Sequence, residues 1–79
     1  MQKAVVARLL ELMRLKNLNM LQLARLSAVS PSTVKNIFYG VSKNTGIVTL
    51  NLLCDGMGIS ITEFFDTDIF RSLEPEEID

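Results

Sequence analysis

The sequence predicts an all-α fold, a compact bundle of five short helices followed by a short C-terminal helical turn. Apolar residues recur every three or four positions along most of the 79 residues, which is the spacing of amphipathic helices. Residues that favour helix starts, such as Ser30 and Ser60, alternate with residues that favour helix ends, such as Gly40 and Gly58. No stretch of useful length alternates apolar and polar residues, so strands are not expected.

The first two helices are expected at residues 2–16 and Met20–Ser27. Apolar residues of the first lie at helical spacing, and Asn17 is a suitable end. Asn19 is a good N-cap for the second, because its side chain can accept a hydrogen bond from the helix start. The second helix has too many apolar residues for one stripe, so we expect it to be either central or covered on two sides.

The third helix is expected at residues 31–39. Ser30 provides its N-cap, and Pro31 occupies the first position, where a missing N–H costs nothing. Gly40 then supplies the left-handed residue that ends a helix. A loop at residues 41–46 follows. A fourth helix is expected at 47–57, with an inward face of Leu50, Leu53, Cys54 and Met57. The capping box of Ser60 and Glu63 opens a fifth helix, and a helical turn at 68–72 and an acidic tail at 74–79 complete the chain. The predicted domain is thus residues 1–73.

Charge is distributed unevenly along the chain. Residues 1–54 carry seven basic residues against Glu11 alone, a net charge of +6, whereas residues 55–79 carry one basic against eight acidic residues, a net charge of −7. The total of −1 argues at first sight against a nucleic-acid partner. The basic body with its acidic tail argues the other way.

The residue types exclude several kinds of function. The chain has one cysteine, Cys54, and no histidine, so a disulfide scaffold, a standard zinc site and Ser/His/Asp or Cys/His catalysis are not expected. We expect no enzyme activity, no cofactor, no metal and no small-molecule ligand. No segment resembles a signal peptide or a membrane span, and a cytoplasmic location is expected.

Residues 20–39 carry the functional signal. Two helices of about eight residues meet there through a short turn, with Ala24 where they must approach closely and Ala28 in the turn itself. Val34 and Ile37 are spaced to pack the third helix against the second. This pattern is typical of a helix-turn-helix, in which the second helix of the pair is presented outward.

The outward face of the third helix has side chains that can bind DNA. An α-helix fits the major groove, where Asn pairs with adenine, Lys reaches guanine, and hydroxyls bond base edges or phosphate. The expected base contacts are Ser32, Thr33, Lys35 and Asn36. The contacts to the DNA backbone expected from the residues themselves are Asn19, Ser30, Tyr39, Lys43 and Asn44.

The chain resembles the phage-repressor helix-turn-helix family of the Xre or Cro type over residues 5–66. The matching stretches are Leu23-Ala24, Ala28-Val29-Ser30, Ser32-Thr33-Val34, Ile37, Gly40, Thr49-Leu50, the run from Cys54 to Ser60, and Glu63-Phe64-Phe65. The resemblance implies a lambda-repressor-like five-helix bundle whose third helix reads the major groove, generally as a homodimer on a palindromic operator. It also implies the same four base-side residues, and on the backbone side it implies Gln22 and Ser42 together with Asn19, Lys43 and Asn44.

The chain departs from this family at several positions. Met20 stands where the family usually has Gln, whose side chain braces contacts to DNA. Thr45 stands where Pro often precedes the fourth helix. Met13 and Phe38 occupy positions that often hold a buried Arg–Glu ion pair. Replacing such a pair as a unit by two apolar residues is often neutral or stabilising.

Two functions remain open from the sequence. The first is a small transcriptional regulator, expected to be a repressor acting by occupancy as a homodimer, with a dimer face of Phe65, Ile69, Phe70 and Leu73. For these residues the alternative is that the C-terminal segment folds back over its own core. The second function is a protein–protein interaction module, such as an antirepressor or assembly subunit, that keeps the fold without specific DNA binding.

Overall fold

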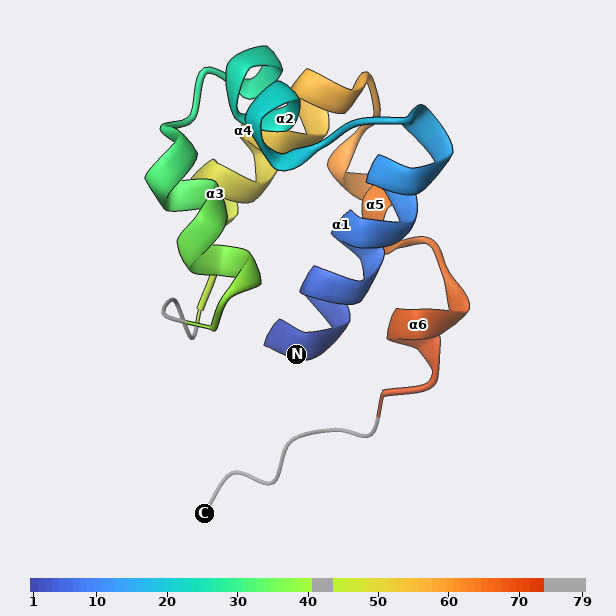
Figure 1. The fold of residues 1–79 in the computed structure, drawn as a ribbon. Coiled ribbons are helices and arrows are strands. Elements are labelled where there is room, and N and C mark those ends of the chain that lie inside the picture. The colour runs from blue at the N-terminus through green and yellow to red at the C-terminus, as the bar shows by residue number, and fades with distance from the viewer. Residues whose placement is uncertain (41–43, 74–79) are drawn as a thin grey trace.

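The computed structural model describes residues 1–40 and 44–73. Within them the chain forms helices and no strand (Figure 1). The helices are α1 (Gln2–Lys16), α2 (Met20–Ser27), α3 (Pro31–Phe38), α4 (Ile47–Met57), α5 (Ile61–Phe65) and α6 (Asp68–Arg71). The all-α prediction is confirmed. The predicted tail at 74–79 lies outside the described residues.

The predicted caps explain why the helix bounds agree so closely with the sequence. Asn19, Ser30 and Ser60 each accept a hydrogen bond from the backbone of their own helix start. Asn17 and Ala28 take the left-handed conformation, with φ of 57° and 54°. Two bounds differ: α3 ends at Phe38 and α6 at Arg71, and in each case the next residue is the C-cap rather than the last helical residue.

Ala28 lies in the turn between α2 and α3, and its backbone is in the left-handed conformation. A left-handed backbone conformation costs a residue other than glycine roughly 1–2 kcal/mol. Its backbone N–H donates to the carbonyl of Arg25, and the N–H of Val29 donates to that of Ala24. The turn therefore ends α2 and fixes the direction in which α3 starts.

The core lies between α1, α2, α4 and α5. Leu9, Leu23, Leu53 and Phe64, one from each of these helices, are fully buried. The other core residues are Val5, Leu12, Met13, Ala24, Val34, Ile37, Leu50, Cys54 and Met57. The inward face predicted for the fourth helix is confirmed at all its positions. Phe38 packs against this cluster from its edge.

Helices α2 and α4 approach each other closely at Ser27 and Gly56. A Cβ atom added at Gly56 would lie 2.9 Å from both Cα and N of Ser27, a distance that requires the backbone to move. Ser27 is buried, and its hydroxyl has no hydrogen-bond partner among the described residues. The close contact of the two helices thus depends on glycine at position 56.

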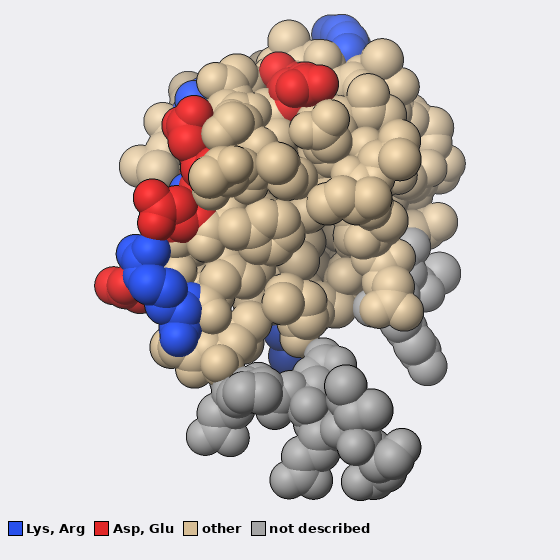
Figure 2. Space-filling model, turned by 180° about the vertical axis from the view of Figure 1, so that it is seen from behind, with Lys and Arg blue, Asp and Glu red and all other residues tan. Residues whose placement is uncertain are grey.

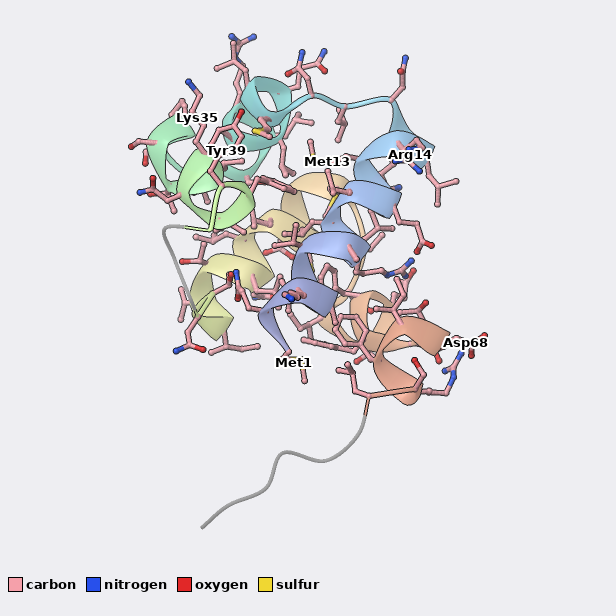
Figure 3. The ribbon with its side chains drawn as sticks, turned by 60° about the horizontal axis from the view of Figure 1, so that its bottom comes forward. Met1, Met13, Arg14, Lys35, Tyr39 and Asp68 are labelled. Carbon is pink, nitrogen blue, oxygen red and sulfur yellow. The ribbon has the colours of Figure 1, made fainter. Side chains whose placement is uncertain are left out.

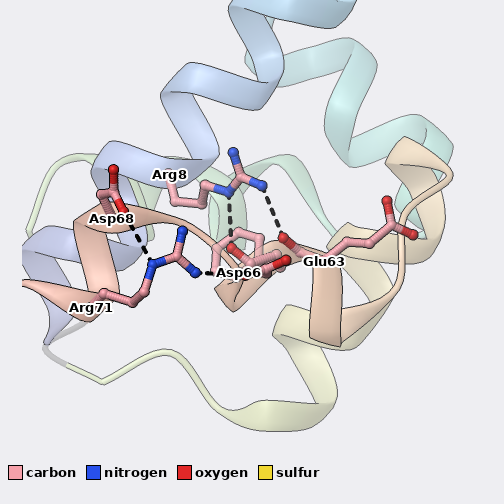
Figure 4. A network of polar contacts seen from close by, with 6 residues as sticks. Arg8, Glu63, Asp66, Asp68 and Arg71 are labelled. Carbon is pink, nitrogen blue, oxygen red and sulfur yellow. Dashed lines mark hydrogen bonds and ion pairs between the residues drawn. The ribbon is translucent and has the colours of Figure 1, made fainter.

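The C-terminal elements are fastened to α1 by Arg8. Its Nε donates to the carbonyl of Phe64 and its Nη2 to that of Glu63, both at 2.9 Å (Figure 4). These carbonyls belong to the last turn of α5, where few helical N–H donors remain to reach them, although that of Glu63 also accepts from the N–H of Asp66 at 3.3 Å. Arg8 also pairs with Glu11, and only 13% of its side chain is exposed. The guanidinium group therefore caps α5 and joins it to α1.

Candidate nucleic-acid interface

The α2–α3 corner positions the candidate interface. Val34 and Ile37 of α3 are buried, as is Leu23 of α2, and the two helices pack together at this corner. The opposite face of α3 points away from the bundle. In Figure 1, α3 lies at one edge of the molecule and α6 at the other. This is the arrangement of a helix-turn-helix whose second helix can enter a groove.

Three of the expected base contacts lie on the outward face of α3. Ser32, Lys35 and Asn36 are exposed, and Figure 3 shows Lys35 far from Asp68 at the other end of the molecule. Together they offer a hydroxyl, an ammonium and an amide, which match the donors and acceptors of base edges.

Thr33 is placed differently from the other three. It is half-buried, its backbone N–H donates to Ser30 Oγ at 3.2 Å, and its hydroxyl lies 2.8 Å from the same oxygen. The Ser32 hydroxyl is 3.3 Å from Ser30 Oγ. The three hydroxyls form one cluster at the start of α3. Helical spacing alone did not show that Thr33 is turned toward Ser30.

Asn19 and Gln22 form a capping box at the start of α2. The N–H of Gln22 donates to Asn19 Oδ1 at 2.8 Å, and the N–H of Asn19 donates to Gln22 Oε1 at 2.9 Å. Both amide oxygens are thereby occupied. Both NH₂ groups, which can only donate, make no hydrogen bond to any described residue. The start of α2 thus presents donors and a positive dipole end, which suit a phosphate.

The other expected backbone contacts are Ser30 at the start of α3, Tyr39 at its end, and residues of the segment that follows. Ser30 is exposed, although its hydroxyl already serves as the N-cap. Tyr39 is 70% exposed and lies near Lys35 in Figure 3. Asn44 is exposed. The two remaining candidates, Ser42 and Lys43, lie outside the described residues.

The charge distribution separates this interface from the rest of the surface. Between Glu11 and Asp55 the sequence has no acidic residue, so neither α2 nor α3 carries one. The described acidic residues Asp66 and Asp68 lie at the C-terminal side, where both pair with Arg71. Seen from behind, charged side chains gather mainly along that edge (Figure 2). Neither α2 nor α3 therefore has an acidic side chain that would repel a phosphate of DNA.

The expected dimer face is partly used within the chain. Phe65 and Phe70 pack against the core, and their ring centroids lie 4.8 Å apart. Each ring also contacts Phe64. Ile69 is half-buried, and Leu73 is 38% exposed. The C-terminal turn therefore folds back onto α1 and α5. Folding back over the chain's own core is the alternative that the sequence left open for these residues. The homodimer stays a prediction.

Cys54 is a core residue. Its side chain is fully buried, and burial, together with the charge of Asp55, raises the pKa of the thiol to about 11. A protonated, inaccessible thiol is a poor nucleophile and a poor metal ligand. Among the described residues, no cluster of His, Cys, Asp or Glu could hold a metal ion.

Sequence reasoning missed two hydrogen-bonding side chains of α1. Gln2 was not singled out, yet its amide bonds to Thr45 across 43 residues of sequence. Arg8 was counted only as a basic residue, yet it caps α5. No local pattern could have identified either contact, because both depend on how distant helices pack.

Comparisons with known proteins agree with this geometry. The model of the Cro/C1-type HTH DNA-binding domain matches residues 8–68. A crystal structure of the prophage Lp1 protein 11 is similar, with a TM-score of 0.79 and 33% sequence identity over 91% of this chain and 95% of that chain. No curated protein matches. None of the described helices is long and apolar enough to cross a membrane.

Proposed function

Because the chain belongs to the family of Cro/C1-type helix-turn-helix DNA-binding domains, we propose that it binds double-stranded DNA sequence-specifically and regulates transcription. Domains of this family are generally non-enzymatic. The proposed mode of binding is insertion of α3 into the major groove. The observation that carries this proposal is the outward face of α3, where Ser32, Lys35 and Asn36 are exposed while Val34 and Ile37 anchor the helix from behind.

Each group on this face has a proposed role. Asn36 can pair bidentately with adenine, and Lys35 can reach the acceptors of guanine. Ser32 and Thr33 stand at the first turn of α3, where a hydroxyl can bond a base edge and the Thr methyl can contact a thymine methyl. The hydroxyl cluster with Ser30 holds these two side chains in a defined orientation, which favours discrimination between bases.

Contacts to phosphate would fix the position of α3 in the groove. The free amide groups of Asn19 and Gln22 at the start of α2 can hold one phosphate. Tyr39 and Asn44, near the end of α3, can hold others, together with Ser42 and Lys43. Such contacts bind all DNA sequences alike, so they would set the register and overall affinity rather than the specificity.

The proposed assembly is a homodimer on a palindromic operator, which represses by occupancy in the cytoplasm. A two-fold dimer places its recognition helices about 34 Å apart, one turn of DNA. Ile69 and Leu73, next to the packed rings of Phe65 and Phe70, supply apolar surface for a partner copy. The similarity to a prophage protein is consistent with a regulator from a phage or mobile element.

The test is selection of bound duplexes from a random pool at moderate salt, followed by a salt titration on the enriched sequence. We expect a palindrome with half-sites about one turn apart. We also expect a slope of log affinity against log salt near −0.9 for each phosphate contact. Enrichment of a single half-site would retain DNA binding and contradict the dimer.

A protein–protein module is the second candidate function. The observation that favours it is the number of large apolar side chains exposed on the surface. These include Leu10, Leu15, Leu21, Leu26, Ile47 and Val48. An apolar partner interface would respond little to salt. No enrichment from the pool, together with a flat salt response, would favour this function.

A further inference from the structure

The first residue of α1 is hydrogen-bonded to the segment that precedes α4. Gln2 Nε2 donates to the hydroxyl of Thr45 at 2.9 Å, and the backbone N–H of Thr45 donates to Gln2 Oε1 at 3.0 Å. The Thr45 hydroxyl also lies 3.2 Å from Gln2 Oε1. Both residues are half-buried. One amide thus contacts both the main chain and the side chain of the same residue.

These bonds are the connection of residues 44–46 to another helix. Among the described residues, no other hydrogen bond joins this segment to an element besides α4 itself. Gly46, the N-cap of α4, has no side chain with which to fix the helix start. Gln2 does not cap the first N–H groups of α4, but it restrains Thr45, the residue that precedes this N-cap.

The same end of α1 also faces the end of α3. A hollow of about 250 Å³ separates them. Its lining residues are Gln2, Lys3, Val6, Ile37, Phe38 and Gly40. The first turns of α1 thus lie across this hollow from the end of α3, and Gln2 is also bonded to Thr45. The start of α1 is therefore next to both the end of α3 and the segment that contains Asn44.

We infer that Gln2 is a positioning residue for DNA binding: it holds Thr45 so that Asn44, next to it, meets the DNA backbone while α3 lies in the groove. This inference rests on the proposed function. Gln2 itself need not touch DNA. Without its amide, Asn44 would remain present but would have to be ordered on binding, and the entropy lost there would weaken affinity for every sequence equally.

The test is a double-mutant cycle on the enriched duplex. Gln2→Met keeps the length of the side chain and removes its hydrogen bonds. We expect it to weaken binding about tenfold, without changing the preferred bases. We expect Asn44→Ala to weaken binding by a similar factor, and the double variant to bind about as well as either single one, because each change cancels the net gain in affinity from the same phosphate contact. Asn51→Met, an exposed change on α4, serves as control.

Two measurements separate positioning from loss of the fold. Hydrogen exchange of the Thr45 amide should accelerate in Gln2→Met while exchange of core amides stays unchanged. Ethylation of one phosphate per half-site, which blocks the parent protein, should no longer matter to the variant. Thr45→Ser should preserve both properties. If Gln2→Met does not fold, Thr45→Val, which loses only the hydroxyl contacts, should give a smaller change in the same direction.

The outcomes distinguish this inference from the function on which it rests. If the parent protein selects no duplex, both are overturned. If the parent binds and Gln2→Met binds with equal affinity, an equal ethylation pattern and a protected Thr45 amide, only the positioning role is wrong. Strictly additive losses in the double-mutant cycle would also overturn it.

Discussion

The two sides of this molecule use their polar side chains in different ways. At the α5–α6 side, Arg8 donates to carbonyls of α5, and Arg71 pairs with Asp66 and Asp68. At the α2–α3 corner, capping side chains use their oxygens and leave donors free, and Lys35 makes no hydrogen bond or ion pair to a described residue. At the α5–α6 side the side-chain hydrogen bonds stabilise the fold, whereas at the α2–α3 corner donors remain available for an acidic partner.

The difference concerns charge as well. The α5–α6 side has acidic residues, and each described basic residue there has an anionic or carbonyl partner. The α2–α3 corner has no acidic residue in either helix. An unpaired lysine beside neutral donors costs little in water and gains energy against phosphate, because binding releases condensed counterions. The comparison indicates which side supports the fold and which would bind DNA.

The largest expected effect comes from removing the support of α5. Arg8→Met removes two hydrogen bonds from a charged donor, to the carbonyls of Glu63 and Phe64, and bonds of this kind contribute about 1.5–3 kcal/mol each. We expect a loss of about 3 kcal/mol in the free energy of unfolding, measured by urea denaturation. Arg71→Met is the matched control, because its ion pairs are exposed and should contribute little.

If the α5–α6 side supports only the fold, Arg8→Met should lower the stability and leave the base preference unchanged. At a temperature where the variant is folded, its preferred bases should match those of the parent protein. Altered base preference would mean that the two sides of the molecule are coupled. Equal destabilisation by Arg8→Met and Arg71→Met would mean that the contacts to the α5 carbonyls contribute nothing.

Gly56→Ala is expected to have the next largest effect. The added Cβ would lie 2.9 Å from backbone atoms of Ser27, so α2 and α4 must separate. Overpacking of this kind costs about 1–3 kcal/mol. Because Ser27 is the last residue of α2, the shift should reach the corner and weaken DNA binding too. The double variant Gly56→Ala with Ser27→Gly should recover part of the stability, and its failure to do so would contradict the assigned clash.

Asn36→Ala should affect recognition alone. We expect a loss of about 2 kcal/mol of affinity for the selected operator, since a bidentate contact to one base carries about 1–3 kcal/mol of discrimination. Binding to random DNA and the unfolding midpoint should stay unchanged. Asn51→Ala, on the exposed surface of α4, is the control. Equal losses on matched and random duplexes would show that Asn36 contacts the DNA backbone instead.

The smallest effect at neutral pH concerns Cys54, in the core shared by both sides. Burial raises the pKa of its thiol from the ordinary value of 9.0 to about 11. The folded state therefore holds this proton more tightly than the unfolded state. The resulting stability is fully present below pH 9 and is lost as the pH rises through 11. The Cys54→Ala variant lacks this titration, so the alkaline fall in the unfolding midpoint should be shallower than in the parent.

Local sequence signals predicted most of the fold. Asn19, Ser30 and Ser60 cap helices whose starts agree with the prediction, since each cap acts within three residues of its own position. The outward residues of α3 followed from the same helical spacing that placed Val34 and Ile37 inward. Phe65 and Phe70 were less predictable, because their burial depends on how the C-terminal turn folds back.

The sequence by itself determined the helices, the corner and the residues that α3 presents, because caps and periodicity act within one or two helical turns. Tertiary structure alone decided three other features. Arg8 reaches carbonyls 55 and 56 residues away, Gln2 reaches Thr45 across 43 residues, and Gly56 meets Ser27. These contacts exist only once the helices have packed. Packing brings Arg8 and Gln2 within hydrogen-bond distance of their partners and brings Gly56 against Ser27.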